Sequence, residues 1–256
     1  MGRTGFWRRF LPVWIAGLVG VLGLALQPLP QALVAQAVAQ GLPTATLRLL
    51  VLVQPLLLMT ALAAAGAAVA HRCGLGSRLA GTLSIRPHAL AGSLAGGAVL
   101  GVVLALLDRA AAPALGPAWQ ALLEQADRAP AWPGLAVGLS YGGLAEEVMM
   151  RWGLMSLTVW LLTRLAGRSA HGPSQIHYLA GIVLAALAFA AGHLPAVAMA
   201  ADLTPALVAR TLALNAAAGL VYGVLFWRSG LEAAIAAHAG SHLGIGLVRA
   251  LGWSEP

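Results

Sequence analysis

Long apolar runs separated by short polar segments occupy almost the whole chain. A helix needs about 20 apolar residues to cross the hydrocarbon core of a bilayer, and these runs are close to that length. In chain order they cover residues 11–26, 47–70, 89–107, 135–162, 176–193, 205–227 and 231–251. The pattern predicts an all-α fold, a polytopic membrane helix bundle with about seven transmembrane helices.

One longer polar segment divides this pattern into two parts. Residues 108–133 contain charged residues, prolines and tryptophans, and we expect an external loop there that can hold a short interfacial helix. We therefore expect residues 1–130, the N-terminal transmembrane helices and this loop, to adjoin a helical core of residues 131–256. Both parts would form one membrane-embedded unit.

The composition agrees with a membrane protein and argues against a nucleic-acid partner. Apolar residues make up 60% of the chain and charged residues only 9%, where soluble domains have about 25%. The mean hydropathy is +0.84. The net charge of +7 comes from arginine, because the chain has no lysine. These arginines stand at the ends of apolar runs, so the expected partners are membrane lipids.

The placement of the arginines predicts the orientation of the chain in the membrane. Arg109 and Arg128 fall in loops on one side, and nine other arginines fall on the opposite side. The nine are Arg3, Arg8, Arg9, Arg72, Arg78, Arg86, Arg164, Arg168 and Arg228. By the positive-inside rule we expect a multi-pass protein of the inner (plasma) membrane with a cytoplasmic N-terminus. The composition, rich in alanine, glycine and arginine, is typical of a GC-rich bacterial genome. Alternatively, the first run is a signal peptide cleaved near residues 35–37.

Glycines at four-residue spacing on the third run indicate close helix packing. The run contains Gly92-x-x-x-Gly96 and Gly97-x-x-x-Gly101. Such spacing lets helix backbones approach each other in a membrane, where dispersion forces must replace the hydrophobic effect. We expect both pairs to face another helix.

Three charged residues lie inside the fourth apolar run. Each charge costs roughly 3 to 10 kcal/mol at the middle of a bilayer, so Glu146, Glu147 and Arg151 must face protein or water. On a helix Glu147 and Arg151 are four residues apart and can pair, whereas Glu146 lies about 100° round the axis. Glu146 is then free to project into a pocket and act as a base. The alternative is a buried ionic cluster that only joins two helices.

Histidines and an asparagine are the other polar residues within the late apolar runs. His193 follows Phe189 by one turn, and the last run carries His238 and His242, four residues apart on one helix face. That spacing also occurs in helical two-histidine metal sites. We expect Phe189 to shield His193, and Asn215 either to line the pocket or to hydrogen-bond between helices.

Two features of these polar residues concern their depth. Simple span limits place His193 near the external end and His238 nearer the cytoplasmic end, although a shared pocket needs them level. Arg210 and Glu232 lie near span ends, where long side chains can reach the interface, so we leave both out of the site.

The order of these motifs resembles a known family. The chain has Glu146-Glu147-x-x-x-Arg151, then Phe189-x-x-x-His193, then His238-x-x-x-His242 on successive helices. This set resembles the CAAX prenyl protease and bacteriocin-processing (CPBP, or Abi) family of intramembrane proteases over about residues 135–250. The segment 219–238 also resembles the family's approach to its last motif.

The resemblance implies an endopeptidase that cuts a membrane-associated protein or peptide near the membrane surface. Glu146 and His193 would activate a water molecule, and His238 with His242 would stabilise the oxyanion. Glu147 and Arg151 would support the site. One departure is His242, where the family usually has asparagine. An imidazole can also donate a hydrogen bond to an oxyanion, but it is a much better metal ligand than an amide.

Two mechanisms follow from these residues. In the metal-free mechanism, which we favour, a carboxylate and a histidine polarise water directly and no cofactor is needed. In the alternative, Glu146, His193, His238 and His242 hold a zinc ion that lowers the pKa of bound water to about 7.

Two other classes of function are compatible with buried polar residues. One is a non-enzymatic membrane protein, an immunity factor or scaffold, in which the polar core only fixes helix packing. The other is a proton-coupled transporter, since buried carboxylates and histidines also form proton relays. The sequence shows no internal repeat, so it gives the transporter no support.

Overall fold

The fold is described from a computed structural model of the chain, for residues 5–84, 87–128, 130–167 and 171–252. The predictions for Arg3, Arg86 and Arg168 fall outside these residues. The protein is 84% helical, and the described residues contain no strand. The all-α prediction is therefore confirmed.

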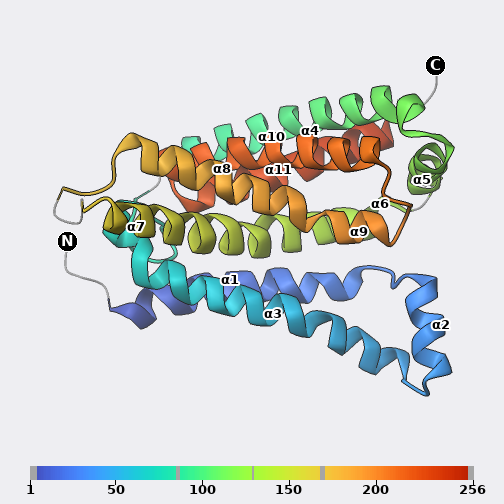
Figure 1. Ribbon diagram of the computed structural model, residues 1–256, viewed down its shortest axis with the longest axis horizontal. Helices are drawn as coiled ribbons and strands as arrows, with labels where there is room; N and C mark the ends of the chain where they lie inside the picture. Colours follow the sequence, from blue (N-terminus) through green and yellow to red (C-terminus); the bar gives the residue numbers. More distant parts are fainter. Residues whose placement is uncertain (1–4, 85–86, 129, 168–170, 253–256) are drawn as a thin grey trace.

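Within the described residues, six helices are long and apolar enough to cross a membrane, and they run along the long axis of the molecule (Figure 1). They are α1 (Phe6–Gly23), α3 (Thr44–Val69), α4 (Pro87–Leu115), α8 (Gln175–Gly192), α10 (Pro205–Ser229) and α11 (Leu231–Ala250). The fourth predicted run is helical from residue 131 to 165 but changes its hydrogen-bonding pattern on the way. This composite helix is not among the six, so the described residues hold six candidate spans where about seven were predicted.

The composite helix has four consecutive parts. It begins with α6 (Ala131–Val137), continues as η3 (Gly138–Glu146) and η4 (Val148–Met155), and ends with α7 (Ser156–Leu165). Both η3 and η4 are π-helical, with hydrogen bonds from residue i to i+5.

Short helices connect the long ones. They are η1 (Leu24–Leu26), α2 (Gln31–Ala39), η2 (Ala70–Cys73), α5 (Pro117–Arg128) and α9 (Leu194–Ala198). Helices α2, α5 and α9 lie at the end of the bundle away from α7 (Figure 1). The short helix expected within residues 108–133 is α5, whereas α2 had no counterpart among the predictions.

Helices α4 and α11 pack against each other through glycine. Cβ atoms added to Gly97 and Gly101 would collide with the α11 backbone, and Gly240 and Gly244 abut the α4 backbone in the same way. The prediction for the second glycine pair of α4 is confirmed. The prediction for residues 92 and 96 is wrong: these glycines are on another face of α4, where a Cβ would meet nothing within 4 Å.

The N-terminal helices support the composite helix directly. Gly20 of α1 abuts Ala145 of η3, and Gly66 of α3 abuts Trp152 of η4. The Trp152 indole donates a hydrogen bond to the Ala63 carbonyl oxygen at 3.2 Å. The helix that carries the acidic pair is therefore held on one side by α1 and α3.

Two charged residues near span ends are engaged with protein groups. Arg210 makes a two-point ion pair with Asp108 of α4, with Nε 2.7 Å from Oδ1. Glu232 accepts hydrogen bonds from the Ser77 hydroxyl (2.6 Å) and the Leu79 amide (2.9 Å) in the loop after η2. Neither residue reaches for the interface as expected, because each has a partner within the fold.

Candidate active site

The acidic pair lies at the junction of the two π-helical segments. Glu146 ends η3, and Glu147 joins η3 to η4. π-Helical segments are usually single turns and often occur at functional sites, so two in succession mark this part of the helix. Our estimate of 100° between Glu146 and Glu147 assumed α-helical geometry and does not apply here.

Glu147 and Arg151 form the predicted ion pair. Arg151 Nη1 lies 3.0 Å from Glu147 Oε1, and both side chains are 0% exposed. Arg151 Nη2 also donates to the Gly219 carbonyl oxygen at 3.0 Å. Its guanidinium lies over the rings of Phe189 (4.9 Å) and Tyr222 (5.2 Å). The partners of the Arg151 guanidinium therefore all lie inside the protein.

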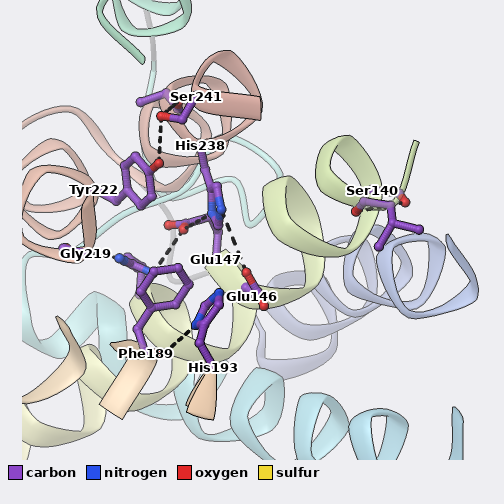
Figure 2. Close-up of polar contacts among 12 residues, drawn as sticks. Ser140, Glu146, Glu147, Phe189, His193, Gly219, Tyr222, His238 and Ser241 are labelled. Carbon is purple, nitrogen blue, oxygen red and sulfur yellow. Dashed lines mark hydrogen bonds and ion pairs between the residues drawn. The ribbon is translucent and has the colours of Figure 1, made fainter. Parts of the chain in front are cut away.

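His238 lies between the two carboxylates (Figure 2). Its Nδ1 is 2.8 Å from Glu147 Oε1, and its Nε2 is 3.8 Å from Glu146 Oε2. Because Glu147 faces Arg151 as a carboxylate, it accepts the hydrogen of Nδ1. We therefore assign the neutral ring the Nδ1–H tautomer, which leaves an unprotonated Nε2 facing Glu146.

His193 has the same tautomer for a different reason. Its Nδ1 lies 2.8 Å from the carbonyl oxygen of Phe189, which can only accept, so Nδ1 carries the hydrogen. Its Nε2 is then a proton acceptor. In Figure 2 the His193 ring and the Glu146 carboxylate point toward each other from two different helices.

Phe189 links the two histidines. Its ring centroid lies 4.7 Å from that of His193 and 5.6 Å from that of His238. The expected difference in depth between the histidines is therefore absent. His193 follows the end of α8, whereas His238 is in the second turn of α11. Since the two rings are nevertheless close together, the neighbouring ends of α8 and α11 lie at different depths. The number of residues from a span limit is therefore a poor guide to the depth of a side chain here.

A tyrosine and a serine that we did not predict also belong to this cluster. The His238 ring is stacked between Tyr222 (4.6 Å) and His242 (5.1 Å). The Tyr222 hydroxyl donates to Ser241 Oγ at 2.7 Å, and Ser241 Oγ lies 3.0 Å from the Gly97 carbonyl oxygen. The sequence feature that could have identified Ser241 is its position one turn after His238, on nearly the same helix face.

Glycines of η3 make room for the two rings of α11. A Cβ on Gly142 would lie 2.6 Å from His242 Nε2 and 3.2 Å from His238 Nε2, and one on Gly138 would collide with the His242 ring. His242 also lines a cavity of about 130 Å³ between α6 and α11. The structure thus places His242 between the cluster and this cavity.

Asn215 takes no part in this arrangement. Its side-chain amide donates to the Thr211 carbonyl oxygen of its own helix at 2.8 Å. The amide thus bonds within its own helix and not to another helix, as one of our two expectations had it.

The four residues of the zinc alternative do not form a ligand cluster. No group of three or more His, Cys, Asp or Glu side chains within the described residues is placed to hold a metal ion. The rings of His238 and His242 are stacked with 16° between their planes, so their in-plane lone pairs run side by side rather than converge. Because the residues do not fit a metal in this arrangement, we derive no step through one.

Comparison with models of protein families gives a match. Residues 128–244 match the family model described as "Type II CAAX prenyl endopeptidase Rce1-like". This part of the chain is similar to the Rce1-like family. The Rce1-like region contains all three motifs and confirms the resemblance that they predicted. It supports, in general terms, a CAAX-protease-like endopeptidase within a multi-pass membrane protein. No curated protein and no solved structure gives a match.

Proposed function

We propose that this protein is an intramembrane endopeptidase that hydrolyses a peptide bond of a membrane-associated protein or peptide by direct activation of water. The observation that supports this most is the convergence of Glu146, His193 and His238 from three helices. The cluster holds two carboxylates, two unprotonated imidazole nitrogens and a buried arginine. Burying such groups in a membrane costs free energy, and a catalytic role would account for their presence there.

The first step uses Glu146 and His193. A water held between the Glu146 carboxylate and His193 Nε2 donates to both, because both are acceptors. As the water oxygen bonds to the substrate carbonyl carbon, Glu146 takes the proton. General base catalysis of this kind contributes about 10²- to 10⁴-fold to the rate.

The second step completes the proton balance. The carbon–nitrogen bond breaks as protonated Glu146 returns its proton to the leaving amine. His242 has one ring N–H to donate to the oxyanion, in place of the amide that is usual in the family. His238 in the assigned tautomer keeps Nε2 as an acceptor beside Glu146, and its orientation depends on Glu147.

The proposal is tested by cleavage of a library of apolar peptides by the purified protein in detergent, read by mass spectrometry. We expect cleavage by the native protein and a loss of at least about 100-fold in Glu146→Gln. The matched control is Glu124→Gln, the same change at a carboxylate of α5 that is 65% exposed. Equal cleavage by native protein and Glu146→Gln would refute the proposal, and so would an inactive native protein.

A second measurement separates the two mechanisms. Native protein washed with a strong chelator should keep its activity on the same peptides. Loss of activity that returns with added zinc would contradict the metal-free mechanism.

We also propose that the protein lies in the plasma membrane with its N-terminus in the cytoplasm. The support is the positive-inside rule, since the arginine-rich ends of the spans gather on one side.

A further inference from the structure

Helix α3 carries a glutamine on the side that faces away from the bundle. The helix lies at the edge of the molecule and packs against α1 and η4 through a buried face that includes Met59, Ala63 and Gly66 (Figure 1). Gln54 precedes Ala63 by nine residues. At 100° per residue this is two and a half turns, so Gln54 lies on the opposite side of the helix. Its side chain is accordingly exposed.

Gln54 lies well inside the part of α3 that can cross a membrane. The candidate span covers Thr44–Cys73, 30 residues whose middle falls between residues 58 and 59. At 1.5 Å per residue, Gln54 is about 7 Å along the helix from this middle. The hydrocarbon core extends about 15 Å on each side of the bilayer centre. With the span centred in the bilayer, the Gln54 amide is therefore at the depth of the hydrocarbon.

The amide of Gln54 has no partner in a single copy of the chain. Within the described residues its side chain makes no hydrogen bond. Other polar side chains of the spans do have partners: Thr60 accepts from the Trp14 indole at 2.9 Å, and the Asn215 amide donates to the Thr211 carbonyl oxygen. An amide without a hydrogen bond in an apolar medium costs free energy. Gln54 therefore requires a partner from outside this copy.

A backbone acceptor beside Gln54 is also short of a donor. The next residue, Pro55, is inside the helix and has no N–H. The carbonyl oxygen of Val51, four residues earlier, consequently lacks its usual helical donor. Two polar groups that lipid tails cannot satisfy thus lie close together on α3.

The residues around Gln54 have the spacing of a helix–helix contact. The set Leu50, Gln54, Leu57 and Ala61, which we call the outer stripe, follows intervals of four, three and four residues. All four side chains are exposed, with Leu50 at 54% and Leu57 at 66%. This is the a/d pattern of paired helices, in which one polar residue can fix the register of the two partners.

We propose that the outer stripe of α3 is a dimer interface that takes a second copy of this chain, with the two Gln54 amides bonded to each other. A side-chain amide is both donor and acceptor, so it is complementary to itself. In a twofold dimer the same residues of both copies meet. Two copies with the same orientation in a membrane place their α3 helices parallel, with Gln54 opposite Gln54. The inference does not depend on the endopeptidase function.

The experiment measures association in liposomes. Copies labelled with donor and acceptor dyes at Glu124→Cys are diluted with lipid, and energy transfer gives the Kd of the dimer. We expect the native protein to associate and Gln54→Leu to raise this Kd at least about 5-fold. Gln54→Asn keeps an amide and should have a Kd closer to native than to Gln54→Leu. The matched control is Gln125→Leu, the same change at an exposed glutamine of α5, which should keep the native Kd.

Disulfide cross-linking in isolated membranes locates the contact. Under mild oxidation, Ala61→Cys in the outer stripe should link two copies. Val99→Cys should not, because Val99 is 66% exposed on α4, across the bundle from α3 (Figure 1). Native Cys73 is buried and gives the background. A monomeric native protein would show that the stripe faces lipid alone and would overturn the proposal. An unchanged Kd in Gln54→Leu, or cross-linking of Val99→Cys without Ala61→Cys, would overturn it too.

Discussion

At the residue scale, the site depends on two carboxylates that differ in their surroundings. Glu147 is fully buried and is neutralised by Arg151, while Glu146 is more open and faces two imidazoles. The sequence predicted this division from four-residue spacing. It did not predict that Tyr222 and Ser241 belong to the cluster. A tyrosine or a serine within an apolar helix can make many different contacts, and which of them it makes depends on the helix that packs against it. The departure at His242 was visible in the sequence, but its stacking on His238 was not.

Gly142 provides a test of the geometry at this scale. In Gly142→Ala the new methyl group would lie 2.6 Å from His242 Nε2 and 3.2 Å from His238 Nε2, so both rings must move. We expect kcat/KM to fall at least about 10-fold, since displacements of about 1 Å can cost 100-fold. The matched control is Gly143→Ala, whose methyl group would make an ordinary 3.5 Å contact with Ala239. Similar activities in the two variants would contradict the arrangement.

At the element scale, hydropathy predicted the long helices and left two features out. The π-helical character of η3 and η4 was not predictable, because apolar and glycine residues fit α- and π-helices alike, and the neighbouring helices decide between them. Helix α5 was expected only as a short interfacial segment. Its position depends on contacts distant in sequence, in which Arg109 donates two hydrogen bonds to Asp127, at 2.9 Å and 2.7 Å.

The contact of α5 with α4 predicts a dependence of stability on pH. Hydrogen bonds from Arg109 hold the pKa of Asp127 below its ordinary value, which is about 3.9 in an unfolded chain. The contribution of Asp127 is therefore complete above about pH 4 and is lost as the pH falls through its lowered folded-state pKa. We expect Asp127→Asn to reduce stability at pH 7 by about 1 kcal/mol and to weaken the acid dependence of thermal unfolding.

The control for this prediction is Glu124→Gln. Its ion pair with Arg128 is exposed on both sides, so the variant should unfold like the native protein. An Asp127→Asn variant with native stability at pH 7 would show that α5 is held by its apolar contacts alone.

At the scale of the whole molecule, the two ends of the bundle differ. One end carries the loop between α3 and α4, and the other carries α2, α5 and α9 (Figure 1). The cavity between α6 and α11 is near the second end, because it is lined by the first residues of α6 and the last turns of α11. The sequence predicted the long helices but not this cavity, which depends on how two distant helices pack.

The proposed orientation, with the N-terminus in the cytoplasm, is tested by thiol labelling of cells whose outer layers have been removed and whose plasma membrane is intact. We expect a membrane-impermeant maleimide to label Glu124→Cys but not Arg78→Cys, which should react only after the membrane is opened. Cys73, the native cysteine, is buried and serves as the background. Labelling of Arg78→Cys alone in intact cells would contradict the proposed orientation.

The central claim is that Glu146 and His193 act together on one water molecule, and a double-mutant cycle of cleavage rates tests it most directly. Residues that act as a unit show losses that do not add, because removing one already abolishes the shared step. We predict that kcat/KM falls about 10²- to 10⁴-fold in Glu146→Gln and in His193→Gln, and that the double variant is no worse than the poorer single variant. Losses that multiply in the double variant, or a single variant with native activity, would contradict the account.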